Sequence, residues 1–158
     1  MVKLRVYADS SVFGGTEDEE FAAASQHFFE RIEKGKFLLV VSAEVLRELE
    51  LAPGTVRKVL ESLPPDVVES VPVGPEVTAL ADAYVAAGVL GPASKSDAIH
   101  VAAATVARAD VIVSWNFRHI VNLDRIRRYN GVNALNGYPP VEIRSPAELA
   151  YADEDEAI

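Results

Sequence analysis

The chain has 158 residues, of which 49% are hydrophobic, and this suits one domain with a substantial core while leaving no room for a second. It contains no cysteine, which excludes disulfide frameworks, thiolate zinc sites and cysteine nucleophiles. The formal net charge of -9 argues against a protein that coats nucleic acid nonspecifically, because that affinity comes largely from neutralising phosphates.

The charge is unevenly distributed along the chain. Four acidic residues stand in a row from Asp153 to Glu156, so we expect residues 1–150 to form a single domain and residues 151–158 to form an acidic, disordered tail. Residues 115–130 instead carry four arginines against one aspartate. This excess is typical either of a solvated helix face or of a patch that contacts phosphate.

No apolar run in the sequence reaches the length of a membrane span. The segment from Met1 to Ala8 runs directly into a strand pattern and does not resemble a signal peptide. We therefore expect a soluble, cytoplasmic protein with no membrane partner.

The first half of the chain alternates between strand-like apolar runs and helix signals. Residues 16–19 have the Thr-x-x-Glu pattern of a helix capping box, after a loop at residues 14–15. Ser42 follows an apolar run and is a good N-cap. In order, the predicted elements are a strand over Lys3 to Ala8, a helix from Thr16 to about Glu33, a strand over Phe37 to Val41, a helix from Ser42 to Pro53, and a short helix to about Leu63.

The second half continues this alternation. The segment from Ser96 to Arg108 is apolar nearly all round, which predicts a deeply buried helix. The other predicted elements are a strand over Val67 to Val71, a helix over Pro75 to Ala87, a strand over Val111 to Ser114, a helix over residues 118–129, and a strand over Val141 to Ile143. Strands that alternate with helices predict an α/β fold with a parallel sheet covered on both faces.

Four polar residues follow these strands directly or stand on the helices after them. Asp9 and Asn116 come after strands, while Glu48 and Asp97 lie on helices that can face them. Ligands gather at the carboxyl ends of strands in such sheets. Three carboxylates and an amide oxygen at one edge repel each other unless a hard cation lies among them, so we expect a site for Mg²⁺ or Mn²⁺ and phosphodiester chemistry.

Each of these residues also has a purely structural interpretation. Asp9 and Asp97 are placed to cap turns or helices. Glu44 competes with Glu48, but the helix periodicity turns Glu44 further toward water. We expect His100 to pack in the core and Trp115 to pack rather than stack on bases, and we expect the Ser10 and Ser114 hydroxyls to orient the carboxylates.

The segments ADSSVF, SAEVLREL, KSDAIHVAAA and VSWNFRHI resemble, in order and spacing, the PIN domain, in the group that includes VapC-type toxins of bacterial toxin–antitoxin pairs. The resemblance runs from Val2 to about Val121. It implies a three-layer α/β/α sandwich and a divalent-metal-dependent endoribonuclease. Its acidic site would consist of Asp9, Glu48 and Asp97. Asn116 stands where many members carry a fourth acid.

The resemblance also implies roles and partners. One Mg²⁺ or Mn²⁺ held by Asp9 and Asp97 would activate a water for attack on phosphorus, and a second ion shared with Glu48 would stabilise the leaving oxygen. Arg118 and Arg125 would contact phosphates of the RNA substrate. A cognate antitoxin protein and a homodimer are further expectations.

Two other functions stay open at this point. The domain could be a catalytically weak PIN-like module that only binds RNA or protein, which Asn116 and the net charge favour. A phosphatase or phospho-acceptor with Asp9 as nucleophile is disfavoured, because Ser11 stands where the phosphatase pattern needs a second aspartate.

Overall fold

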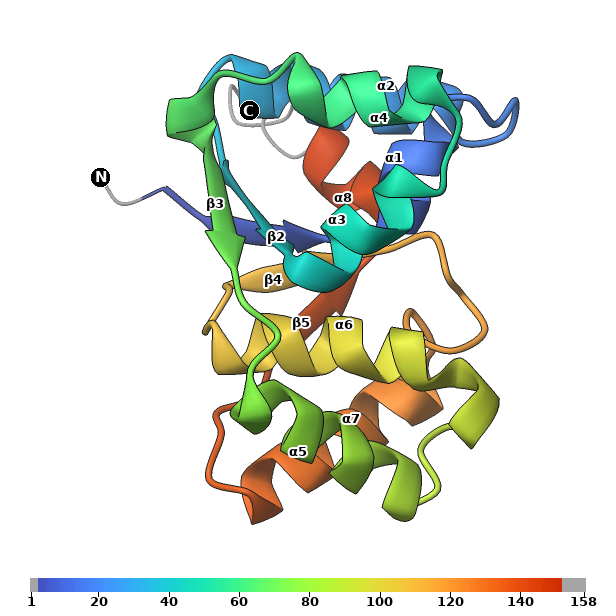
Figure 1. Ribbon diagram of the computed structural model, residues 1–158, viewed down its shortest axis with the longest axis vertical. Helices are drawn as coiled ribbons and strands as arrows, with labels where there is room; N and C mark the ends of the chain where they lie inside the picture. The colour runs from blue at the N-terminus through green and yellow to red at the C-terminus, as the bar shows by residue number, and fades with distance from the viewer. Residues whose placement is uncertain (1–2, 152–158) are drawn as a thin grey trace, which may run out of the picture.

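The computed structural model describes residues 3–151 and centres on a five-stranded sheet in which all strands are parallel. The spatial order of the strands is β3-β2-β1-β4-β5, so β1 is the central strand (Figure 1). The strands are β1 (Arg5–Ala8), β2 (Leu38–Ser42), β3 (Val68–Val71), β4 (Val111–Val113) and β5 (Glu142–Arg144).

The three inner strands are apolar because both of their faces are covered. Val6, Tyr7 and Ala8 of β1 are fully buried, and so are Ile112 and Val113 of β4. Continuous apolar runs of this kind are typical of parallel strands that have helices on both sides. β1 pairs with β4 so that Ala8 lies beside Val113, which brings the residues after both strands to the same edge of the sheet.

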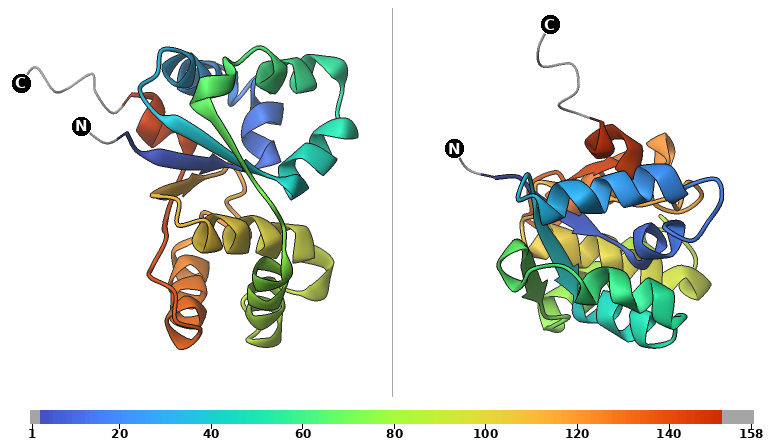
Figure 2. Two further views of the ribbon diagram at one scale, coloured as in Figure 1. Left: turned by 60° about the vertical axis from the view of Figure 1, so that its left-hand side comes forward. Right: turned by 90° about the horizontal axis from the view of Figure 1, so that it is seen from above.

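Helices cover both faces of the sheet, which confirms the predicted three-layer α/β/α arrangement (Figures 1 and 2). One layer contains α1 (Ser10–Gly15), α2 (Ala22–Glu33), α3 (Ala43–Glu50), α4 (Gly54–Glu61) and α8 (Pro146–Ala150). The other contains α5 (Pro75–Ala86), α6 (Lys95–Val106) and α7 (Leu123–Leu135). Short 3₁₀ turns, η1 (Pro65–Val67) and η2 (Pro92–Ser94), precede β3 and α6.

Helix α6 is the buried helix that the sequence predicted. It lies directly against the sheet, and α5 and α7 lie on its far side (Figure 2). Consecutive buried residues from Val101 to Thr105 leave it no solvent-facing stripe over that stretch. The helix contacts β2 and β4.

Two predicted helix starts are wrong, and they concern the segments that follow β1 and β4. The capping box at residues 16–19 does not start a helix, since Thr16 is the C-cap of α1 and its hydroxyl donates to the Phe13 carbonyl at 2.7 Å. The helix expected over residues 118–129 begins only at Leu123, where Asn122 is the N-cap. Local side-chain hydrogen bonds decide both positions.

Within residues 3–151, no helix is long and apolar enough to cross a bilayer. The acidic run at residues 153–156 lies outside the described residues, as does almost all of the predicted tail.

The two glycines of α1 occupy different surroundings, which yields a matched test of its packing. A methyl group at Gly15 would lie 2.6 Å from the Ser25 hydroxyl and 2.8 Å from the Trp115 indole nitrogen, whereas nothing lies within 4 Å at Gly14. We expect Gly15→Ala to lower the free energy of unfolding by about 1–3 kcal/mol through overpacking. We expect Gly14→Ala to raise it by up to about 1 kcal/mol, because alanine favours helix.

Urea unfolding followed by circular dichroism checks both values, and the emission of Trp115, the single tryptophan, reports any displacement of its ring. Equal effects of the two substitutions would contradict the packing described for α1.

Candidate functional site

Asp9 follows β1, and its carboxylate is buried at the edge of the sheet with only 3% of the residue exposed. The Ser11 hydroxyl donates to Oδ1 at 2.6 Å, and the Ser114 hydroxyl donates to Oδ2 at 2.7 Å. Ser114 comes directly after β4, so the pairing of β1 with β4 brings this partner to Asp9. Although Asp9 is the N-cap residue of α1, its side chain accepts no capping hydrogen bond. The capping interpretation of Asp9 is therefore excluded.

Burial dominates the electrostatics of Asp9. It raises the pKa of the carboxyl above its usual value, and the nearby charge of Asp97 raises the pKa further. His100 and the two serine hydroxyls act in the opposite direction, but they do not cancel the effect of burial. The ionised form of Asp9 is thus held at a cost in free energy, which a nearby positive charge would offset.

Glu48 lies on α3 and has hydrogen-bond partners from two other helices. The Ser10 hydroxyl donates to Oε1 at 3.0 Å and the Ser96 hydroxyl to Oε2 at 3.2 Å, while His100 Nε2 lies 2.5 Å from Oε1. Burial by itself would raise the pKa of Glu48, but the hydrogen bond and charge of His100 outweigh it, and the pKa is lowered. Glu48 is therefore ionised and fixed in orientation.

His100 is buried in the core, as the sequence predicted, but it also contacts a residue of the candidate site. It is 2% exposed, and its Nδ1 lies 2.7 Å from the Tyr7 hydroxyl, which in turn lies 2.7 Å from the Ser42 hydroxyl. Burial by itself would lower the pKa of His100, but the hydrogen bond to Glu48 and the charge of Asp9 raise it. In the protonated form that this raised pKa favours, the imidazole donates to Glu48 through Nε2 and to the Tyr7 hydroxyl through Nδ1.

Glu44 does not point to water, which corrects the prediction from helix periodicity. It is 9% exposed, and its carboxylate pairs with Arg47 at 2.6 Å and accepts from the Ser96 hydroxyl at 2.6 Å. The hydrogen bond from Arg47 lowers its pKa. Periodicity within α3 could not predict this contact, because Ser96 belongs to α6, a separate helix that packs against α3.

Asp97 lies in the first turn of α6 and contacts a histidine from a distant part of the chain. His119 Nδ1 lies 3.1 Å from Asp97 Oδ2 and 3.3 Å from the Ser94 hydroxyl. His119 is not among the site residues predicted from the sequence. The only feature of the sequence that could have indicated it is its position three residues after Asn116, in the segment that follows β4.

Asn116 shapes the turn that presents His119. Its amide oxygen accepts the backbone N–H groups of Arg118 at 3.2 Å and His119 at 2.8 Å, and its own N–H donates to the Ser114 hydroxyl at 2.9 Å. The oxygen that the sequence assigned to a metal thus has two partners already. Its part in metal binding stays a prediction.

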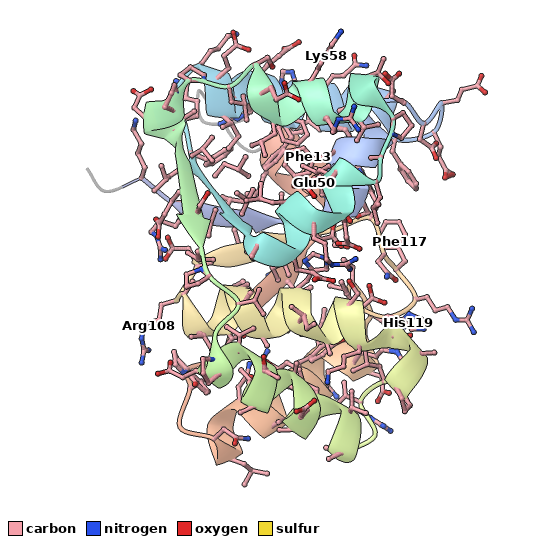
Figure 3. The ribbon with its side chains drawn as sticks, in the orientation of Figure 1. Phe13, Glu50, Lys58, Arg108, Phe117 and His119 are labelled. Atoms are coloured by element: carbon pink, nitrogen blue, oxygen red, sulfur yellow. The ribbon has the colours of Figure 1, made fainter. Side chains whose placement is uncertain are left out.

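The two arginines expected at the phosphate differ in their surroundings. Arg118 is exposed, and its side chain has no hydrogen-bond or ion-pair partner within residues 3–151. Arg125 donates instead to the carbonyl groups of Arg118, at 2.9 Å, and Val89. Figure 3 shows that Phe117 and His119, on either side of Arg118 in sequence, lie on one flank of the molecule, opposite Arg108.

The hydrogen bonds connect the predicted acids into one arrangement. Ser10 and Ser11 are adjacent and bind Glu48 and Asp9, while Ser114, Asn116 and His119 link Asp9 to Asp97. Three carboxylates from three elements therefore share the carboxyl edge of the sheet.

The oxygen donors suit a hard divalent cation, although they do not form a closed cage. Within residues 3–151, no three histidine, aspartate or glutamate side chains converge as a complete set of metal ligands. Mg²⁺ usually needs only one or two carboxylates and keeps several waters. The buried Asp9, with its raised pKa beside Asp97, is the observation that fits such an ion best.

The raised pKa of Asp9 predicts that this residue lowers stability at neutral pH. Because its pKa in the folded chain exceeds the ordinary value of 3.8, the wild-type protein loses stability as pH rises from about 3.8 through the folded pKa. Asp9→Asn removes this loss. We expect the variant to unfold at higher urea concentration than the wild type at pH 7 in EDTA, and this advantage to shrink at pH 4.

Urea titrations at both pH values measure this difference. A variant that is less stable than the wild type at pH 7 would show that the two serine hydroxyls stabilise the charge more than burial destabilises it.

No model of a known protein family matches the chain, and no curated protein matches it in sequence.

Proposed function

We propose that this chain is a divalent-metal-dependent endoribonuclease with a PIN-like fold, which hydrolyses RNA phosphodiester bonds. One observation carries the proposal: Asp9 after β1, Glu48 of α3 and Asp97 of α6 are far apart in sequence, yet hydrogen bonds from residues 10–11 and from residues 114–119 connect them at the carboxyl edge of a parallel sheet. Ligand sites in such sheets lie at this edge. The buried Asp9 carboxylate has hydroxyl groups as its hydrogen-bond partners, and a cation beside it would stabilise its ionised form.

Asp9 and Asp97 are the residues that would hold Mg²⁺ or Mn²⁺, with Glu48 beside them. When bound, the ion supplies a water of lowered pKa and neutralises charge on the phosphate. In hydrolysis the water oxygen bonds to phosphorus, the bond from phosphorus to the bridging oxygen breaks, and a proton ends on the leaving oxygen.

The side chains around the carboxylates hold them in position for this reaction. His100, Ser10 and Ser96 fix both oxygens of Glu48, which keeps it ionised and restricts its rotation. Ser11 and Ser114 do the same for Asp9. Removal of residues that orient metal ligands typically changes activity by 10- to 100-fold. Arg118 is exposed and free to contact a phosphate of the substrate.

The biological setting rests on the sequence resemblance. It assigns the chain to the toxins of toxin–antitoxin pairs, with a cognate antitoxin protein and a homodimer as partners and the cytoplasm as location.

The direct test is cleavage of a mixed transfer-RNA and messenger-RNA pool by the purified protein with Mn²⁺, Mg²⁺ or EDTA. We expect metal-dependent cutting that falls at least about 100-fold in Asp97→Asn, because the variant loses a charged ligand. We also expect Mn²⁺ to raise the melting temperature of the wild type more than that of the variant.

Circular dichroism of the variant controls for its folding. Cleavage that persists equally in EDTA or in Asp97→Asn would contradict a metal-dependent site at these carboxylates.

The two glutamates of α3 offer a matched test of the assigned roles. Glu48→Gln removes the charge that faces His100, and we expect it to lower the rate of cleavage by about 10- to 100-fold. Glu44→Gln removes a charge paired with Arg47 on the same helix but keeps an oxygen that can accept from Ser96, so we expect a smaller change in rate. Single-turnover cleavage at saturating protein gives both values, and a larger loss in Glu44→Gln would reverse the assignment.

A second candidate is a catalytically weak PIN-like module that binds RNA or protein. The observation in its favour is that the Asn116 oxygen accepts two backbone N–H groups and adds no charge. Calorimetry with Mn²⁺ distinguishes the two candidates, because a binding-only module is expected to show neither tight metal binding nor metal-dependent turnover.

A further inference from the structure

Three aromatic side chains cluster beside the carboxylate site. The rings of Phe21 and Trp115 stack with centroids 4.2 Å apart and an interplanar angle of 16°. Phe117 packs edge-on against both, 6.3 Å from Phe21 and 6.1 Å from Trp115. Residues 115 and 117 come from the segment after β4, whereas Phe21 precedes α2, so tertiary structure assembles the cluster.

The inner rings of this cluster are rigidly held. The Trp115 indole N–H donates to the Ser25 hydroxyl at 2.8 Å, and its ring lies so close to Gly15 that a side chain there would clash. The Trp115 backbone N–H donates to the Ser11 hydroxyl at 2.9 Å, and this same hydroxyl donates to Asp9. One serine therefore fixes the aromatic cluster and the buried carboxylate relative to each other.

Phe117 is the outer ring and is open to solvent. It is 48% exposed, although it is large and apolar, and it stands between Asn116 and the exposed Arg118. Figure 3 shows it on the flank of the molecule that also carries His119, the partner of Asp97. An exposed aromatic ring, an exposed arginine and the histidine that contacts Asp97 thus belong to one short segment after β4.

We propose that Phe117 is a stacking site for an unpaired base of the RNA next to the cleaved phosphate; this inference rests on the proposed nuclease function and names its substrate as single-stranded RNA. An aromatic face accepts any base, and proteins use such faces where bases are splayed out of a helix. Arg118 contacts the phosphate that joins this base to the next nucleotide. Bases within a duplex are stacked on each other and do not reach the ring.

The size of this surface favours a base over a protein partner. A stable protein interface covers about 800 Å² on each partner, whereas this site offers one exposed ring supported by two inner rings. A nucleotide matches it in size and also supplies a phosphate for the guanidinium and the metal site.

The test uses the single tryptophan as a reporter of binding. A ten-nucleotide single-stranded RNA of mixed sequence is titrated, with Mg²⁺, into the chain carrying Asp97→Asn, so that the RNA is not cut, and Trp115 emission is followed. We expect quenching by the single strand. Adding Phe117→Ala is expected to raise the Kd about tenfold, because one stacked base contributes about 1–3 kcal/mol and 1.4 kcal/mol is tenfold.

Two control variants isolate the role of the ring. Phe117→Tyr keeps an aromatic face and is expected to keep the affinity. Leu135→Ala removes an apolar side chain that is 88% exposed at the end of α7, and it is expected to leave the affinity unchanged. The complementary duplex is expected to bind more weakly than the single strand.

The possible failures are distinguishable. Equal affinity of Phe117→Ala and Leu135→Ala, equal binding of duplex and single strand, or no binding of RNA would each overturn the stacking site. Cleavage by the wild type in a parallel assay would then still support the nuclease. Conversely, Phe117-dependent binding of RNA without metal-dependent cleavage would support the stacking site and contradict the nuclease.

Discussion

The burial of the Asp9 carboxylate between the ends of β1 and β4 is the constraint on which the rest of the site depends. A carboxylate with 3% exposure is costly when ionised, and here two serine hydroxyls, from the residues after each strand, supply its hydrogen bonds. Those serines also fix their surroundings, since Ser11 accepts from the Trp115 backbone and Ser114 accepts from the Asn116 backbone. The position of one charge thus determines the path of the chain after β4.

The other two carboxylates are held in the same manner, each by a partner from a different element. Glu48 of α3 contacts His100 of α6, and Asp97 of α6 contacts His119 from the segment after β4. Both side chains are only partly exposed, so these pairings fix the orientation of each carboxylate at the edge of the sheet. This arrangement stores electrostatic repulsion at the edge of the sheet, and natural sites accept such a cost in stability where function requires charge.

Local sequence patterns predicted most of the framework. Apolar runs identified the strands, and β2 and β4 lie within a residue or so of the predicted bounds because burial on both faces demands continuous apolar residues. The edge strand β3 also begins within one residue of its predicted start. Ser42 was correctly identified as an N-cap. The prediction failed where competing local hydrogen bonds exist: Thr16 ends α1 instead of starting α2, and Asn122 delays α7. Nothing in the pattern anticipated the two short helices α1, whose residues 14–15 were predicted to form a loop, and α8.

The sequence by itself determined the parallel sheet and the buried α6, since each depends on periodicity, and it selected the three acids as a predicted site. Only the tertiary structure decided which groups contact those acids. His100 and His119 became partners of Glu48 and Asp97, Glu44 became buried, and Phe117 joined a cluster with Phe21, because each contact joins residues far apart in the chain. Periodicity reports which face of one element is apolar, whereas the identity of the group across that face depends on how separate elements pack.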